Sequence, residues 1–302
     1  MSRRAAIAFV LAAAPSVAHA YVRTRTSSGT PVLWNGACAA MVLSSVDNPA
    51  YPADRLHAAF DAVIASWEAK LDGCAPLNVS LADAATTKQD IGYDGTSLLR
   101  WRLPHACDDP AQASSEICRS PNAAAITTVF FVDRPGDPRD GELLEADLEL
   151  NAVNFAFADD GDTAHMDMQN TLSHELGHIM GLDHSCYTLR GGAPPFDSNN
   201  DLVPYCFPLD TLSSSVTEST MFNFADPGET KKRSPGDDEV RAVCELYASR
   251  PATCSAAEIP GCGCRLGDDG PTSLVTGLVT FLIAAFLWPW RRTHRPTHRS
   301  QS

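Results

Sequence analysis

The residues with the clearest chemical potential lie in the stretch TLSHELGHIMGLDHS. His174 and His178 are four positions apart, so on a helix both side chains would lie on one face and could bind one metal ion. Glu175 would be rotated from His174 by about 100°, close enough to reach a ligand of that ion without binding the ion itself. Gly181 would allow the left-handed turn that brings His184 back to the same ion.

Three imidazoles with one open position predict a catalytic zinc site, because a structural site is closed by four ligands. Zinc lowers the pKa of bound water from about 16 towards about 7 and polarises a carbonyl. Glu175 would take the proton of that water and later give it to the leaving amine. The pattern therefore predicts hydrolysis of amide bonds, with His174, His178 and His184 as zinc ligands. The competing class is a module that binds zinc without turnover, and Glu175 argues against it because such a site needs no base.

Hydrophobic periodicity predicts the elements that would position these residues. Apolar residues at helical spacing indicate a core-facing helix over residues 52–71, a second helix over 166–180 and a last helix over 236–249. Short apolar or β-branched runs bounded by Gly, Pro or Asp predict strands at 39–46, 77–83, 96–103, 126–133 and 143–151. This order predicts an α+β fold with one main domain.

The strand predicted over residues 143–151 has a pattern of its own. Its apolar residues alternate with Glu145, Asp147 and Glu149. Such alternation predicts a strand with one face in the core and the other in solvent, so we expect these three carboxylates to be half-exposed.

The two ends of the chain are predicted to lie outside this domain. Residues 1–20 contain Arg3 and Arg4, then an apolar run, then Ala18-His19-Ala20, which together indicate a secretory signal peptide. Residues 274–290 carry no charge and precede a cluster of arginines, which predicts a transmembrane segment. The predicted organisation is a signal peptide at 1–20, a metal-binding domain at 21–250, a linker at 251–271 and a C-terminal tail at 272–302.

The charge of the chain restricts its partners. The formal net charge is −14, and every Asp and Glu lies between the two terminal segments, so the exported part is more acidic still. Such a field repels nucleic acid and anionic membrane, and we expect no nucleic-acid partner. Membrane contact is expected only through the C-terminal tail. The acidity also suits calcium or cationic substrates, although a solvated surface is its commoner cause.

The ten cysteines all follow the predicted signal peptide. An even number in an exported protein predicts disulfides. Short loops favour the pairs Cys107–Cys118 and Cys186–Cys206, and the remaining pairing is left open. The Cys-x-Cys pair at 262–264 lies beside the tail and is set apart from this framework.

Asp197, Asn199 and Asp201 are candidate calcium ligands, because they offer oxygen atoms at alternate positions. They lack the glycine and the distal glutamate of an EF-hand, so a turn rich in Asx residues is the favoured alternative. Asp159, Asp160 and Asp162 have the same two interpretations, a calcium site or a turn rich in Asx residues.

The spacing His174-Glu175-x-x-His178-x-x-Gly181-x-x-His184 resembles the signature of the metzincin zinc metallopeptidases, and the serine that follows resembles their matrixin branch. The resemblance covers roughly residues 40–248. It implies a twisted, mostly parallel β-sheet with an antiparallel edge strand, a long zinc-binding helix and a C-terminal helix. It also implies a zinc-dependent endopeptidase that acts on proteins or peptides.

Further residues gain a role only from this resemblance. Residues 141–151 resemble the edge strand beside bound substrate. Ser219-Thr220-Met221 is similar to the turn that places a methionine beneath the zinc, although an ordinary core methionine is the alternative. Asp237 or Asp238 would tie the last helix to this turn. Matrixins reach the methionine within about ten residues of the third histidine, whereas residues 185–220 intervene here, which puts the shape of the substrate pocket in doubt.

The tail carries a second resemblance. Cys262-Gly263-Cys264, a polar spacer, an apolar run and an arginine cluster resemble the myxobacterial C-terminal sorting signal (MYXO-CTERM). This implies a sorting peptidase that acts near Cys262 and Cys264, and display on the cell surface or outer membrane, or release outside the cell. The alternative is a stop-transfer helix that leaves the domain facing the periplasm.

Overall fold

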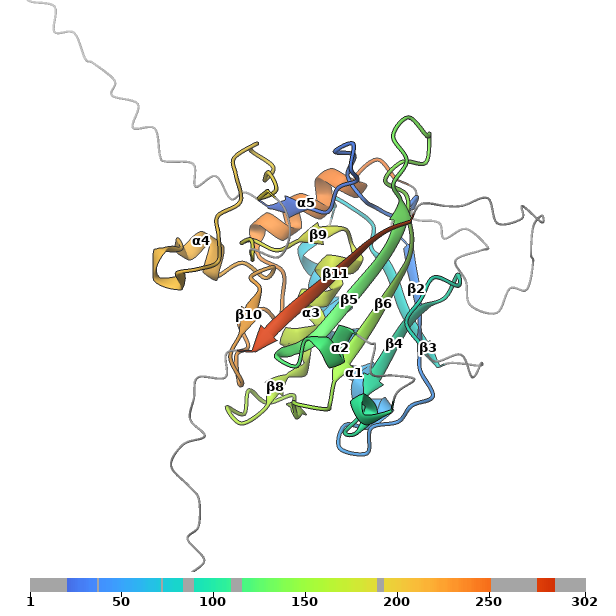
Figure 1. The fold of residues 1–302 in the computed structure, drawn as a ribbon, viewed down its shortest axis with the longest axis vertical. Coiled ribbons are helices and arrows are strands. Elements are labelled where there is room, and N and C mark those ends of the chain that lie inside the picture. Colours follow the sequence, from blue (N-terminus) through green and yellow to red (C-terminus); the bar gives the residue numbers. More distant parts are fainter. Residues whose placement is uncertain are drawn as a thin grey trace, which may run out of the picture.

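A computed structural model describes residues 21–36, 38–71, 73–83, 90–109, 116–188 and 193–250, together with the backbone of 276–285 (Figure 1). The predicted signal peptide and linker, with the Cys-x-Cys pair, lie outside the described residues.

A central sheet organises the chain. Its parallel strands are β3 (Asn78–Asp83), β2 (Cys38–Leu43), β4 (Ser97–Arg102) and β6 (Leu143–Asn151), in that order across the sheet. The next strand, β5 (Ala123–Val132), runs antiparallel to β6. The predicted α+β class and mostly parallel sheet are therefore confirmed, and each predicted strand lies close to its expected position.

The sequence misplaced β6 in two respects. β6 lies inside the sheet between β4 and β5, so the expectation that residues 141–151 form the edge strand is wrong. Its carboxylates are also fully buried rather than half-exposed. Glu145 and Asp147 are covered by the segment before β4 and by the start of β4: the amides of Asp94 and Gly95 donate to Glu145, and those of Gly92 and Leu98 donate to Asp147. Glu149 forms a buried ion pair with Arg102 of β4.

Beyond β5 lies β11 (Thr276–Ala285), which pairs antiparallel with β5 and, at its end, parallel with β10 (Phe224–Ala225). β11 belongs to the apolar stretch that predicted a transmembrane segment, and the described part of that stretch is a strand. Threonine, valine, phenylalanine and isoleucine in this run suit a strand, and β5 provides main-chain partners. No helix within the described residues is both long and apolar enough to cross a bilayer.

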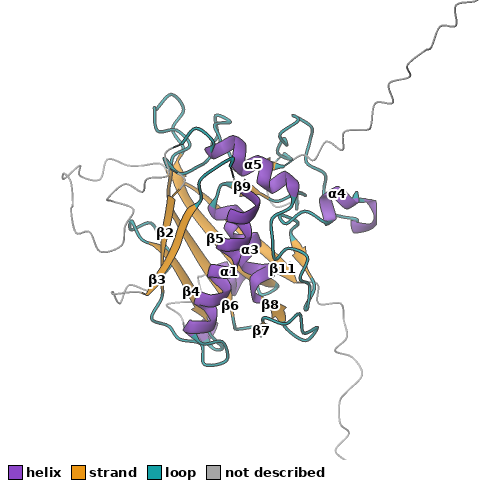
Figure 2. Cartoon of the chain, turned by 180° about the vertical axis from the view of Figure 1, so that it is seen from behind, coloured by secondary structure: helices purple, strands orange, loops and turns teal. Residues whose placement is uncertain are grey.

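Figure 2 shows three helices across one face of the sheet: α1 (Ala53–Leu71), α3 (Met168–Ile179) and α5 (Asp237–Tyr247). α1 buries the predicted apolar stripe, with Ile64 at its margin, and the Trp67 indole donates to Ser173 on α3 at 3.0 Å. α3 therefore lies between α1 and β5, within the largest hydrophobic cluster. This position makes the site-bearing helix one of the least solvent-accessible elements of the described structure.

Disulfides and short elements complete the fold. The predicted pairs Cys107–Cys118 and Cys186–Cys206 are present, and Cys74–Cys244 links the end of α1 to α5. The remaining short elements are β1 (Val22–Arg23) paired with β9 (Leu182–Asp183), β7 (Phe157–Ala158) paired with β8 (Met166–Asp167), α2 (Glu116–Arg119), α4 (Ser214–Thr217) and 3₁₀ turns at Ala106–Asp108 and Leu209–Thr211.

Candidate metal centre

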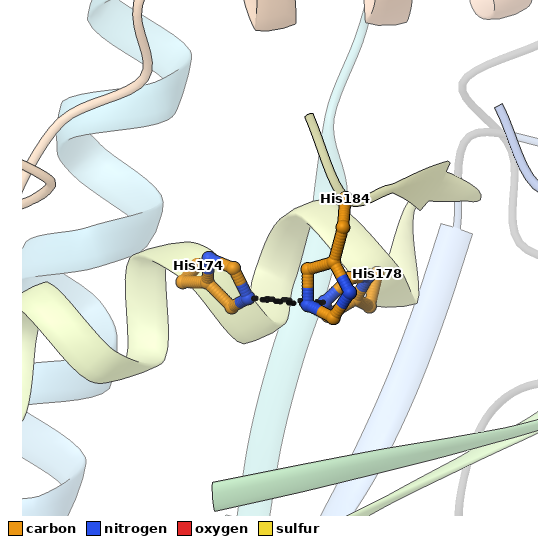
Figure 3. Close-up of side chains that lie close together, drawn as sticks. All are labelled: His174, His178 and His184. Carbon is orange, nitrogen blue, oxygen red and sulfur yellow. Dashed lines mark hydrogen bonds between the residues drawn. The ribbon is translucent and has the colours of Figure 1, made fainter. Parts of the chain in front are cut away.

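The structure brings the three predicted histidines together (Figure 3). The Nε2 atoms of His174 and His178 are 3.1 Å apart, those of His178 and His184 are 3.2 Å apart, and those of His174 and His184 are 3.3 Å apart. Tetrahedral ligands at a zinc–nitrogen distance of about 2.05 Å are separated by about 3.3 Å. The spacing of the three nitrogens therefore fits one zinc-sized ion.

The end of α3 explains how His184 reaches the other two histidines. Gly181 has a φ of 86°, and its amide donates to the carbonyl of His178. A Cβ at this position would overlap the carbonyl oxygen of Val32, so both the left-handed backbone and the close approach require glycine. The chain then enters β9, and His184 follows directly.

Two of the rings are oriented by backbone carbonyls. His174 Nδ1 lies 2.7 Å from the Thr220 oxygen, and His178 Nδ1 lies 2.9 Å from the Leu182 oxygen. Because a carbonyl can only accept, each Nδ1 must donate, and the lone pair of each Nε2 faces the common centre.

All three imidazoles are held neutral. Burial, together with the neighbouring histidines, keeps the pKa of His174 and of His178 well below the usual range. Burial lowers the pKa of His184 to about 3. Neutral imidazole is the form that binds a metal ion, so the donor set suits a divalent cation before any ion arrives.

Glu175 is fully buried beside this cluster. Its Oε2 accepts a hydrogen bond of 2.6 Å from the Thr127 hydroxyl on β5, and its Oε1 has no hydrogen-bond partner within the described residues. Burial raises the pKa of this carboxyl group to about 8. A buried carboxyl oxygen with no protein partner indicates that a further ligand completes the site. The role of Thr127 carries no sequence signal, because it depends on the pairing of β5 with distant strands.

Met221 lies against α3, where a Cβ on Gly177 would overlap its sulfur atom. The turn before it is fixed by Glu239, whose Oε1 accepts from Ser219 Oγ at 2.6 Å and from the Met221 amide at 3.1 Å. Glu239, the third acidic residue of α5, therefore connects the last helix to this turn.

The expectation that Asp237 or Asp238 makes this tie needs correction. Asp237 lies at the exposed start of α5, whereas Glu239 is 1% exposed and faces the turn. Helical rotation turns Asp237 to solvent, whereas Asp238 and Glu239 are both buried, and the longer glutamate side chain is the one that bonds to the turn.

The unusually long segment 185–220 does not displace Met221 from the histidines. The Ser185 amide donates to the Met221 carbonyl at 3.0 Å, so the segment begins and ends at the same place. The Cys186–Cys206 disulfide and the bond from Ser185 Oγ to the Val216 carbonyl close it internally.

The candidate calcium ligands form a turn of their own. Asp197 Oδ1 accepts from the amides of Asn199 and Asp201, at 2.8 and 2.9 Å. Asp159 is bound to Tyr51 and Arg55. In the described part of the chain, the three histidines form the one group of three or more potential ligand side chains close enough to share an ion.

No protein-family model matches this chain, and no curated protein matches it. The functional assignment therefore depends on the geometry and chemistry of the site itself.

Proposed function

We propose that this protein is a zinc-dependent endopeptidase of the metzincin type, similar to matrixins, that hydrolyses bonds in proteins or peptides. The observation that carries the proposal is the convergence of the His174, His178 and His184 Nε2 atoms beside the fully buried Glu175. A purely structural metal site has no use for a buried carboxyl group with an unpartnered oxygen.

The three histidines would hold the ion, and their neutral form and mutual spacing fit zinc. Zinc in such a site supplies a Lewis acid that acidifies water and polarises a carbonyl. The chain supplies the rest of the chemistry. Burial raises the pKa of the Glu175 carboxyl group above the ordinary carboxyl range, which suits a base that later returns its proton. The Thr127 hydroxyl fixes Oε2 and leaves Oε1 to face the reactants.

An extended polypeptide is the substrate class that the sheet supports. β11 lies along β5 with Phe281 opposite Thr127, the residue that binds Glu175. The main-chain groups of β5 therefore accept an extended chain beside the candidate base. Substrate binding by strand addition of this kind uses backbone hydrogen bonds for affinity and side-chain pockets for selectivity.

Export is part of the proposal. The disulfides among the described residues support it, because such bonds persist in oxidising compartments. We further propose that the Cys262–Cys264 region and the tail direct sorting to the cell surface, with a periplasm-facing anchor as the alternative.

The test compares the zinc-loaded chain with a Glu175→Gln variant and with chelator-treated protein, using casein and gelatin as substrates. We expect Glu175→Gln to bind zinc in the same 1:1 ratio and to lose activity by about 10²–10⁴-fold. Glu245→Gln, on an exposed side chain of α5, is the matched control. Turnover that survives both the chelator and Glu175→Gln would reject the proposal. Zinc binding without any turnover would identify a non-catalytic module.

A further inference from the structure

Lys232 is a fully buried lysine close to the candidate metal centre. Its Nζ donates to the carbonyl of Phe222 at 2.9 Å and to the carbonyl of Phe224 at 2.6 Å. The carboxylate of Glu229 lies 3.4 Å away and provides the countercharge. An ammonium group has three donors, and two of them are directed at the short segment that follows Met221.

The backbone of the same lysine is attached to the metal-binding helix. The Lys232 amide donates to Asn170 Oδ1 at 2.8 Å, and Asn170 precedes His174 by one turn of α3. The next residue, Arg233, forms an ion pair with Asp167, which caps the N-terminus of α3. Lys232 therefore connects α3 directly to residues 222–224.

Residues 222–225 border the space that an extended chain can occupy. β10 pairs in parallel with β11, with Phe224 opposite Ala284, while β11 is antiparallel to β5. β11 thus lies between β5 on one side and β10 on the other, and a substrate in extended conformation would occupy the same space. The carbonyl of Phe224 is held by Lys232, so this lysine sets where one side of that space stands relative to the histidines.

A buried ammonium is not needed to fill this volume. An apolar side chain of similar length would fill the same space without the desolvation that a charge suffers, but it would leave the carboxylate of Glu229 without its countercharge. What an apolar side chain cannot do is hold two carbonyls at fixed positions. The buried charge of Lys232 is therefore better explained by the positions it gives to the two carbonyls than by the space its side chain fills.

We propose that Lys232 is a positioning residue for substrate, which fixes the wall formed by residues 222–225 relative to the metal centre and thereby sets peptide affinity and selectivity. This inference rests on the proposed peptidase function.

The experiment uses the zinc-loaded full chain and a pair of peptides that differ only in the residue after the cleaved bond, one small and one large. Lys232→Met keeps the length of the side chain and removes its donors. Lys231→Met is the matched control, because the adjacent Lys231 binds Thr217 and Glu218 at the surface. We expect Lys232→Met to raise KM roughly tenfold, as loss of a charge-assisted hydrogen bond would. We also expect it to change the ratio of kcat/KM between the two peptides, with little change in kcat or zinc content.

The ratio between the two peptides is independent of the folded fraction, so partial unfolding cannot mimic the result. If Lys232→Met does not fold, Lys232→Gln retains a donor and takes its place. An inactive wild type would remove the peptidase proposal itself. An active wild type whose KM and peptide ratio are unchanged by Lys232→Met would overturn the role of Lys232 alone. Loss of zinc from the variant, or failure of both variants to fold, would also overturn it, because Lys232 would then serve the metal centre or the fold.

Discussion

At the scale of single residues, Gly177 and Met221 depend on each other. Gly177 lies inside α3, where glycine costs about 1 kcal/mol relative to alanine. The reason for glycine is local: a Cβ here would overlap the Met221 sulfur and would lie 3.0 Å from its Cε. The Met221 side chain thus determines which residue α3 can carry at position 177.

We expect Gly177→Ala to lower the free energy of unfolding by up to about 2 kcal/mol, because overpacking costs about 1–3 kcal/mol and the gain in helix propensity offsets about 1. In a Met221→Ala background the same substitution should instead stabilise the protein, since the space is then open. Denaturant unfolding of the four proteins in this double-mutant cycle measures the coupling. An equal effect of Gly177→Ala in both backgrounds would show that the two residues do not compete for the same volume.

At the scale of elements, α5 and the Met221 turn are joined by one buried carboxyl group. Burial, and then the neighbouring Asp238, raises the pKa of Glu239 to about 7. The unfolded value is about 4.3. A carboxyl group whose folded pKa is raised contributes stability that is fully present below the unfolded pKa and is lost as pH rises through the folded pKa. The junction should therefore weaken between about pH 4 and pH 7.

Glu239→Gln should remove this loss, because an amide oxygen can still accept from Ser219 and Met221 but does not ionise. We expect the variant to gain stability relative to wild type as pH rises from 4.5 to 7.5, by a difference on the order of 3 kcal/mol. Urea unfolding across this range is the measurement, with Glu245→Gln on the exposed side of α5 as the control. A difference between variant and wild type that stays constant with pH would contradict the assignment.

Local patterns predicted the elements, and long-range contacts decided what the sequence missed. Residue spacing alone indicated α1, α3, α5 and the strands β2 to β6, whereas β11 was predicted as a transmembrane segment. The spacing of the three histidines and Gly181 sufficed to predict the histidine cluster. The burial of Glu145 and Lys232 depends instead on segments distant in sequence that fold over them. Alternation along one strand reports only that its two faces differ. It carries no information about what a neighbouring loop will cover.

At the scale of the whole molecule, the Cys74–Cys244 disulfide spans a sequence separation of 170, whereas Cys107–Cys118 spans 11. Loop-closure entropy gives about 5 kcal/mol for the long bridge and about 3 kcal/mol for the short one. We expect replacement of both Cys74 and Cys244 by serine to lower the midpoint of thermal unfolding more than the same change at Cys107 and Cys118. Calorimetry of the two paired variants checks the order, and a reversed order would show that native strain or residual structure outweighs chain entropy.

The strand β11 also has a consequence at this scale. A second extended chain must compete with the strand that already pairs with a sheet edge. We therefore expect a chain that ends at residue 270 to cleave peptides with a higher kcat/KM than the chain that retains residues 271–302. Equal zinc content in both proteins is the control. A lower or unchanged kcat/KM in the shorter chain would mean that substrate reaches the histidines without using the outer edge of β5.

The hydrogen bond from the Ser185 amide to the Met221 carbonyl joins the two ends of the long segment 185–220. The segment between these residues returns to its starting point at this bond, and its last residues are part of the scaffold, because the Thr220 carbonyl bonds to His174 and Ser219 bonds to Glu239. Evolution could therefore have altered the residues between Cys186 and Val216 to suit new recognition tasks while the imidazole arrangement stayed constant, and protein engineers can graft binding loops into the same part of the chain.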